Sequence, residues 1–354
     1  MGNLIIGMGN TGTQIVKLAA RSELLDNTSM YVIDSQSSQI DMDTVTRITS
    51  IPIVTDDKCG SGRSRERGKT MFDIHKEAGD FNGLIEEALN SLSPVIVITS
   101  SAGGTGSGST PSMCAMLKEK GIYVIPIIIC PDLKDPDAFH LNPNDLMMDL
   151  QGIGIETYAI FRNEFGKADY TDINGEVVRL IEIIFGKYYD ATDKDTIDAS
   201  DLDVILSVPG RFMAITVDAD SPEKLAKAVT SKVFNCHQPA WKTEDAEKTT
   251  LVKAFALTSP CADSDFETVF AMLNERIPHS YDEYRNVSNK DGRCRATVII
   301  SGLPRVELRN IDSEFMEAGH IADGVHESKR PAFLAKKGGV RTTQQKTVKG
   351  FNIQ

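Results

Sequence analysis

Residues 100–109 read SSAGGTGSGS, and they lie between the apolar run PVIVIT and a helix-like run that begins near Ser109. A flexible linker is not expected between a buried strand and a helix. Successive glycines let backbone N–H groups converge on an anion, and the hydroxyls of Thr105, Ser107 and Ser109 add further donors. Open α/β sheets bind ligands at the carboxyl ends of their strands. The stretch therefore predicts a phosphate-binding loop.

A second glycine-rich loop, GMGNTG at residues 7–12, follows the apolar run LIIG and opens a helix-like stretch. Its G-x-G-x-x-G pattern allows backbone amides and a helix N-terminus to approach a phosphate group. Asp34 ends the next apolar run 22 residues after Gly12, where a dinucleotide-binding fold has its ribose-binding acid. By itself this loop predicts an NAD-linked oxidoreductase, and the alternative is a tight strand-to-helix turn.

A third glycine-rich loop, CGSGRSRERGKT at residues 59–70, ends in Gly-Lys-Thr. A P-loop needs a glycine five residues before Gly68, and Arg63 occupies that position, which excludes the motif. What remains is a glycine-rich loop with three arginines and a lysine, suited to a phosphate or to an acidic partner surface. The loops at 7–12 and 100–109 are both predicted to bind phosphate. If they face one crevice, they favour a triphosphate as the ligand, because its oxygens outnumber what one loop can satisfy.

Short apolar runs and helical stretches alternate along the first half of the chain. Near-continuous β-branched runs such as VIPIIIC, separated by helices, indicate parallel strands that are covered on both faces. After about residue 211 the apolar runs acquire period-2 character, which predicts a second, smaller α/β domain. The predicted fold class is α/β, with a Rossmann-like parallel sheet, a long central helix, the second domain, a C-terminal helix and a tail. The predicted segments are 1–171, 172–210, 211–309, 310–328 and 329–354.

Charge is distributed unevenly along the 354 residues. The segment 329–354 holds seven Lys/Arg and no acid, so that a net charge of −12 becomes −19 for the rest of the chain. Such a segment is typical of binding to nucleic acid or acidic surfaces, and the alternative is a solvated tail that keeps the protein soluble. The six cysteines contain no Cys-x-x-Cys, which argues against zinc and a disulfide framework and favours a reducing cytosol. Neither a membrane span nor a secretory signal is predicted.

Residues 102–108, AGGTGSG, resemble the signature loop of the tubulin/FtsZ superfamily, which usually has glycine at the position of Ala102. The segment 7–14 resembles the first phosphate loop of that family, and Asp34-Ser35-Gln36 resembles the Asp-x-Gln after its second strand. The segment 60–69 is similar to the loop of FtsZ that senses the γ-phosphate. The resemblance implies a nucleotide site that contains Gly7, Gly9, Asn10, Thr11, Gly12, Thr13, Gln14, Asp34, Gly60, Gly62, Arg63, Ala102, Gly103, Gly104, Thr105, Gly106 and Ser107.

The resemblance to the tubulin/FtsZ superfamily also implies a pocket in this protein that binds the guanine base. Asn163 resembles the guanine-contacting asparagine of the family. Tyr170 and Asn174 resemble the start of tubulin's central helix, where a tyrosine stacks on guanine and an asparagine bonds to its edge. The loop 131–138, PDLKDPDA, departs from the Phe/Glu/Arg pattern of FtsZ. The acid that contacts ribose is therefore left open among Asp132, Asp135 and Asp137.

The segment after the central helix resembles the catalytic loop of FtsZ, Asn-x-Asp-x-x-Asp, with Asp198 and Asp201 as the two acids and Thr196 in place of the asparagine. In this family the loop completes the GTPase site of the neighbouring subunit. The alternative is a solvated acidic turn that caps a helix. The short basic tail, in place of an apolar docking peptide or an acidic tail, looks more like the phage and plasmid TubZ/PhuZ group.

The resemblance implies a tubulin-like GTPase that polymerises with GTP and Mg²⁺, hydrolyses GTP at the subunit interface, and segregates or positions plasmid or phage DNA. Its expected partners are copies of itself in a head-to-tail filament, and a DNA-bound adaptor or DNA at the tail 329–354. The expected location is the cytoplasm of a bacterial cell or an infected host. An FtsZ-type cell-division GTPase and, with less support, an NAD-dependent oxidoreductase are the alternatives.

Overall fold

The protein is described by a computed structural model. It covers residues 2–35, 47–55, 60–91, 93–132, 134–162, 170–186, 199–234, 237–238, 252–258, 271, 281–286, 294–305 and 308. The predicted C-terminal helix (310–328) and tail (329–354) lie outside these residues. None of the helices within them is long and apolar enough to cross a membrane.

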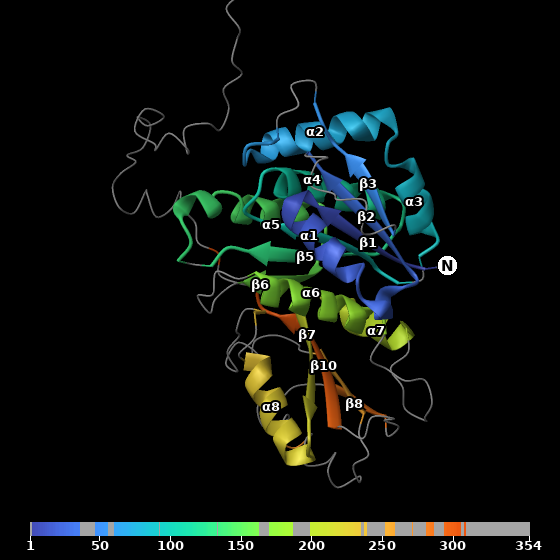
Figure 1. The fold of residues 1–354 in the computed structure, drawn as a ribbon, viewed down its shortest axis with the longest axis vertical. Helices are drawn as coiled ribbons and strands as arrows, with labels where there is room; N and C mark the ends of the chain where they lie inside the picture. The colour runs from blue at the N-terminus through green and yellow to red at the C-terminus, as the bar shows by residue number, and fades with distance from the viewer. Residues whose placement is uncertain are drawn as a thin grey trace, which may run out of the picture. The chain divides into compact units, whose positions relative to one another are not determined.

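Ten strands in the described ranges form one sheet, in the order β3-β2-β1-β4-β5-β6-β7-β10-β8-β9 (Figure 1). Neighbouring strands from β3 to β7 are parallel, whereas β10 runs antiparallel to both β7 and β8, and β9 is parallel to β8. The Rossmann-like parallel sheet predicted from the sequence is confirmed. The strands are β1 (Asn3–Met8), β2 (Thr28–Asp34), β3 (Ile48–Pro52), β4 (Val95–Ser100), β5 (Val124–Cys130), β6 (Thr157–Arg162), β7 (Gly210–Ala219), β8 (Val252–Thr258), β9 (Tyr281–Asn286) and β10 (Cys294–Leu303).

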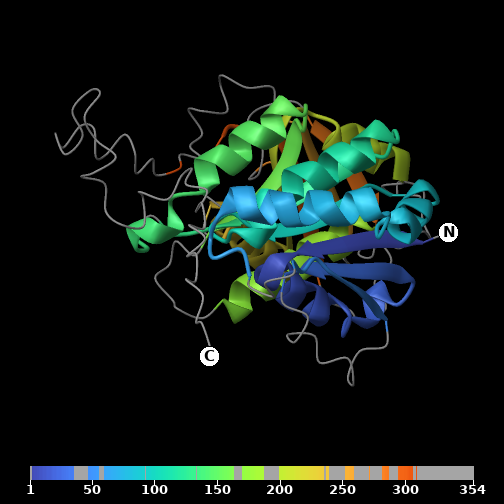
Figure 2. The same cartoon turned by 90° about the horizontal axis from the view of Figure 1, so that it is seen from above.

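Helices cover both faces of the parallel part of the sheet (Figure 2). Successive strand residues point to opposite faces, so Ile5 packs in the core with α1 (Gly9–Ala19) and α6 (Thr171–Ile184). Leu4 and Ile6 pack instead with α2 (Arg65–Ala78) and α4 (Thr105–Glu119). Burial on both faces is the reason that these strands read as continuous apolar runs. The remaining helices are α3 (Asn82–Leu89), α5 (Pro143–Gly152), α7 (Ala199–Leu206) and α8 (Pro222–Phe234), with short 3₁₀ turns at Glu23–Leu25 and Asp137–Phe139.

Helix α4 begins at Thr105, ahead of the start near Ser109 that the sequence predicts, so the second half of SSAGGTGSGS is helical. The hydroxyls of Ser109 and Thr110 donate to the carbonyl oxygens one turn earlier, at 2.6 and 2.7 Å. These hydroxyls are therefore satisfied within the helix. The glycines let α4 pack closely on α2, since a Cβ atom at Gly108 would collide with the Arg65 carbonyl oxygen.

The helical segment between β3 and β4 is interrupted, because α2 and α3 are separate helices. Gly79 ends α2 with φ of +83°, in the left-handed region that glycine adopts without strain. The predicted central helix is α6, whose apolar stripe of Val177, Leu180, Ile181 and Ile184 is buried.

Candidate nucleotide site

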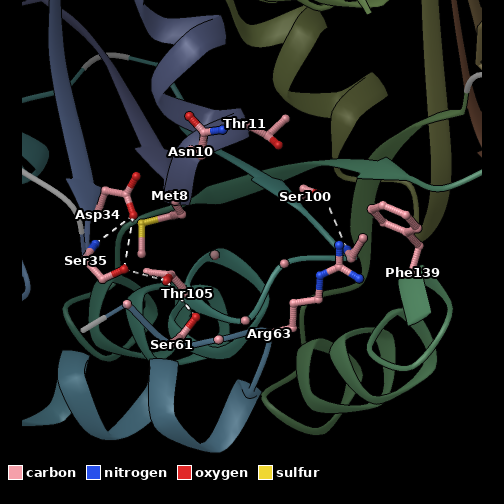
Figure 3. Close-up of a pocket in the computed structure, with 17 residues that line it drawn as sticks. Met8, Asn10, Thr11, Asp34, Ser35, Ser61, Arg63, Ser100, Thr105 and Phe139 are labelled. Atoms are coloured by element: carbon pink, nitrogen blue, oxygen red, sulfur yellow. Dashed lines mark hydrogen bonds between the residues drawn. The ribbon is translucent and has the colours of Figure 1, made fainter. Parts of the chain in front are cut away.

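The three glycine-rich loops meet at the carboxyl edge of the parallel sheet, around one open pocket of about 380 Å³ (Figure 3). The loop after β1 contributes the start of α1, the loop after β4 contributes the start of α4, and the loop before α2 lies across from them. The pocket is lined by Met8, Gly9, Asn10, Thr11, Asp34, Ser35, Gly60, Ser61, Gly62, Arg63, Ser100, Ala102, Gly103, Gly104, Thr105, Gly106 and Phe139.

Two helices begin at this pocket without a capping side chain. Neither Met8, at the N-cap of α1, nor Gly104, at the N-cap of α4, makes a side-chain capping hydrogen bond, and the first turns hold no acidic residue. The first amides of a helix have no intrahelical acceptor, and the helix dipole adds positive potential there. The two N-termini therefore favour a ligand with several negative charges, such as a polyphosphate.

Glycines allow the loops to lie backbone against backbone. Gly9 has φ of +68°, and a Cβ atom on it would lie 2.9 Å from the Gly106 amide nitrogen. A Cβ atom on Gly106 would lie 2.6 Å from the Thr99 hydroxyl and 2.8 Å from the Met8 carbonyl oxygen. The loops after β1 and β4 are thus held so close together that both helix N-termini open into the same pocket.

The other predicted residues of the first loop support the pocket from behind and do not line it. A Cβ atom on Gly7 would lie 2.5 Å from the Gly12 carbonyl oxygen, and one on Gly12 would lie 2.5 Å from the Ile98 carbonyl oxygen. The Thr13 hydroxyl donates to the Gly9 carbonyl oxygen at 2.9 Å. These contacts fix the turn from β1 into α1. The remaining predicted residues that do not line the pocket are Gln14 and Ser107.

A chain of hydrogen bonds joins the end of β2 to the loop after β4 and the loop before α2 at one side of the pocket, and Figure 3 shows it as dashed lines. The Ser35 amide donates to the Asp34 carboxylate at 2.7 Å, and the Ser35 and Thr105 hydroxyls lie 2.9 Å apart. The Thr105 hydroxyl also lies 2.9 Å from the Ser61 hydroxyl. A carboxylate and three hydroxyls, all on buried residues, therefore form this side of the pocket wall.

The arginines of the third loop have different surroundings. Arg63 is in the left-handed region, with φ of 66°, and its guanidinium carbon lies 4.5 Å from the centre of the Phe139 ring at the edge of the pocket. Arg65 faces away: it pairs with Asp149 at 2.6 Å and donates to the Ser107 carbonyl oxygen at 3.1 Å. Arg63 is therefore the arginine of this pair whose charge lies at the pocket.

The guanine-binding residues predicted from the sequence are only partly described. Tyr170 is at the N-cap of α6 with 44% of its surface exposed. Burial, followed by the negative charges of Asp135 and Asp132, raises the pKa of its phenol. This places Tyr170 near the acidic loop 131–138. Neither Tyr170 nor Asn174 lines the 380 Å³ pocket, and Asn163 lies outside the described residues.

The two predicted catalytic acids stand on either side of the first residue of α7 in the sequence. Asp198 lies outside the described residues, and Asp201 is in α7 although its side chain is not described. No group of three or more His, Cys, Asp or Glu that could hold a metal ion occurs among the described residues. Mg²⁺ binds nucleotides through phosphate oxygens, waters and one or two protein groups. The Asp34 carboxylate and the neighbouring hydroxyls fit that kind of site.

Several residues that line or support the pocket are not among the site residues predicted from the sequence. Met8, Ser35, Ser61, Ser100 and Phe139 line it. Phe139 directly follows the acidic loop 131–138. Its position next to that loop is the sequence feature that could have identified it as a pocket residue. Asn142 supports the pocket from the start of α5, and no sequence pattern marks it.

Comparison with known proteins gives a consistent result. No protein-family profile matches the chain. The cell division protein FtsZ of Buchnera aphidicola (subsp. Acyrthosiphon pisum) is 25% identical over 127 residues, which cover 36% of this chain and 31% of that protein. The FtsZ of Neisseria gonorrhoeae is 21% identical over 301 residues, covering 77% of this chain and 73% of that protein. The match to the Buchnera protein thus spans about a third of its length.

Solved structures share the fold over most of their length. GDP-bound CetZ1 from Haloferax volcanii superposes with a TM-score of 0.70 and 16% identity, covering 90% of this chain and 100% of that one. TubZ of Clostridium botulinum phage c-st has a TM-score of 0.65 and 16% identity, with 90% and 97% covered. An FtsZ dimer from M. jannaschii has a TM-score of 0.65 and 16% identity, with 88% and 94% covered.

The parallel sheet, the glycine-rich loops and these structures define an α/β fold of the tubulin type. The chain has the fold of the tubulin/FtsZ superfamily, which confirms the fold that the loop sequences predict. TubZ, CetZ and FtsZ structures are all among its neighbours. The particular likeness to the TubZ/PhuZ group stays a prediction from the tail.

Proposed function

We propose that this protein is a GTPase that assembles head to tail and hydrolyses GTP at the interface between subunits. The observation that carries the proposal is the convergence of two uncapped helix N-termini, of α1 and α4, on one glycine-lined pocket. Relatives with the same fold support it, since one structure is titled as GDP-bound and another as a GTPγS-bound protofilament.

In this proposal the triphosphate lies along the two helix N-termini, where backbone amides and Arg63 offset its charge. Bound Mg²⁺ would neutralise charge on the phosphates, with Asp34 and the nearby hydroxyls as its protein ligands or as partners of its waters. The guanine base would stack on Tyr170, with Asn163 and Asn174 at its edge. The chain's own groups thereby orient the substrate, and phosphoryl transfer depends chiefly on such positioning and charge stabilisation.

The water-activating acids are assigned to the neighbouring subunit. Asp198 precedes α7 and Asp201 is in its first turn, and we propose, from the resemblance to FtsZ, that their loop contacts the γ-phosphate of the next molecule. There they would orient and polarise the attacking water. An isolated subunit is then nearly inactive, and each added subunit completes one site. Contacts of this head-to-tail type do not close on themselves, so they produce filaments.

The test is sedimentation of the full chain with Mg²⁺ and GTP, GDP or NAD, together with phosphate release. We expect pelleted filaments and a phosphate-release rate per subunit that rises with protein concentration in GTP only. GDP should bind without stable assembly, and NAD should not bind. Binding of NAD in preference to GTP, or a rate per subunit that is independent of concentration, would overturn the proposal.

We further propose that the filament carries DNA, through the basic segment 329–354 and either an acidic adaptor or DNA itself. The support is the charge asymmetry, +7 on this segment against −19 on the rest of the chain. Deleting 329–354 is expected to remove binding of cargo while GTP hydrolysis persists. Phosphate contacts make binding to DNA weaken steeply with salt, which a salt titration with duplex DNA measures. If the deletion stops assembly instead, the segment belongs to the filament contact.

A further inference from the structure

Asn142 joins two of the loops that form the pocket. It is 6% exposed, and its side-chain amide nitrogen lies 3.0 Å from the Arg63 carbonyl oxygen. The same nitrogen lies 3.2 Å from the carbonyl oxygen of Ala102 and 3.3 Å from that of Gly103. One buried side chain therefore bonds to the loop before α2 and to the loop before α4.

Asn142 does not act as an ordinary helix cap. It occupies the N-cap position of α5, where asparagine usually accepts a hydrogen bond from an amide in the first turn. Its side chain makes no such bond, and it donates instead to the two pocket loops. The side chain thus bonds to the pocket loops and does not cap the helix that it begins.

These bonds contribute to the direction of two backbone amides, together with the Ser107 hydroxyl, which also donates to the Gly103 carbonyl oxygen. A trans peptide is planar, so a carbonyl and the N–H of the next residue point to opposite sides. The Ala102 and Gly103 carbonyls point toward Asn142, so the amides of Gly103 and Gly104 point away from it. Ala102, Gly103 and Gly104 line the pocket, whereas Asn142 does not. Neither amide donates to an acceptor within the described part of the chain.

We propose that Asn142 is a positioning residue, which directs the Gly103 and Gly104 amides toward the phosphates of a bound nucleotide and holds the Arg63 loop against them. This inference rests on the proposed nucleotide-binding function. Its physical basis is preorganisation: two amides already oriented toward an anion need no rearrangement when the anion binds. Space is available there, because a Cβ atom on Gly103 would meet no protein atom within 4 Å.

The test compares Asn142→Asp with Asn142→Ala in the full chain. Aspartate has the same shape, but its carboxylate has no N–H to donate and repels the three carbonyl oxygens. The matched control is Gln238→Glu, because Gln238 is also buried and donates to the Ala214 carbonyl oxygen at 3.0 Å, on β7. Binding of GTP, inorganic pyrophosphate and guanosine is measured by calorimetry and NMR, and the melting temperature of each variant is recorded.

We expect Asn142→Asp to weaken binding of GTP and pyrophosphate by roughly tenfold or more, the effect of losing about one charge-assisted hydrogen bond. Asn142→Ala should have a smaller effect in the same direction. Guanosine, which lacks phosphates, should bind both variants as it binds the wild type, and Gln238→Glu should keep its affinity for pyrophosphate even if it melts earlier.

Three results would overturn the inference. The first is unchanged affinity of Asn142→Asp for GTP and pyrophosphate. The second is a loss of GTP affinity that equals the loss of guanosine affinity and accompanies a fall in the melting temperature. A merely structural role of Asn142 would produce that result. The third is a wild-type protein that binds neither GTP nor pyrophosphate, which overturns the proposed function as well. A wild type that binds pyrophosphate but not GTP or guanosine contradicts only the proposed function, and the Asn142 variants then decide the inference on pyrophosphate.

Discussion

Asp201→Ala is expected to lower GTP turnover by roughly 10²–10⁴-fold, the usual contribution of one acid–base group, while GTP binding and assembly persist. The reason is the division of labour in the proposed site. The pocket residues of one subunit bind the nucleotide, and Asp201, in α7, is assigned to the water in the pocket of the next subunit. Phosphate release should stop while pelleting with GTP continues, and electron microscopy should show filaments that persist.

The matched control for this prediction is Asp203→Ala, an identical change two residues further along α7. Asp203 is exposed, and we assign it no role in the reaction, so its variant should hydrolyse GTP at close to the wild-type rate. Normal hydrolysis by Asp201→Ala would remove the proposed catalytic role. Equal loss in both variants would assign the effect to the helix and not to the Asp201 carboxylate.

Gly104→Ala is expected to lower GTP affinity by roughly 10- to 100-fold, because an overpacking cost of about 1–3 kcal/mol falls on the loops that hold the nucleotide. A Cβ atom on Gly104 would lie 2.5 Å from the Ser61 hydroxyl and 2.6 Å from the Ser64 amide nitrogen. Its backbone is in the right-handed helical region, which alanine accepts, so the collision is the whole effect. The loop before α2 must move, with a cost of about 1–3 kcal/mol in the free energy of unfolding.

Calorimetry with GTP and denaturant unfolding measure these two effects. The control is Gly83→Ala in α3, where the added Cβ atom would meet no atom within 4 Å. Alanine in that helix should leave GTP affinity unchanged and should raise the free energy of unfolding by up to about 1 kcal/mol. Wild-type affinity in Gly104→Ala would show that the loop contacts around Gly104 do not shape the nucleotide site.

Local patterns predicted the sheet and the position of the loops, because they depend on residues that are near one another in the chain. The run VIPIIIC becomes β5, buried on both faces, and its lack of alternation follows from that burial. The predicted start of α4 was wrong because it depends on a contact with another part of the chain. Helix α4 starts early at Thr105, since its glycines accept close packing against α2. No periodicity in the segment itself carries that information.

The three arginines of the loop before α2 illustrate what the sequence left open. By composition they are equivalent candidates for a phosphate or an acidic partner. The structure separates two of them, because Arg65 is held by Asp149 and the Ser107 carbonyl oxygen, whereas Arg63 lies beside Phe139 at the pocket. Phe139 and Asn142 come from a later loop, so their position could be known only from the folded chain.

The sequence by itself determined the fold class and the loops that can approach an anion, since glycine spacing and apolar runs act over a few residues. SSAGGTGSGS is one of those loops, and its glycines provide backbone amides without fixing their direction. Only the tertiary structure decided that direction. The carbonyls of Ala102 and Gly103 accept hydrogen bonds from Asn142, about 40 residues away in the chain, and that of Gly103 accepts a second one from the Ser107 hydroxyl. Peptide planarity then orients the amides that follow.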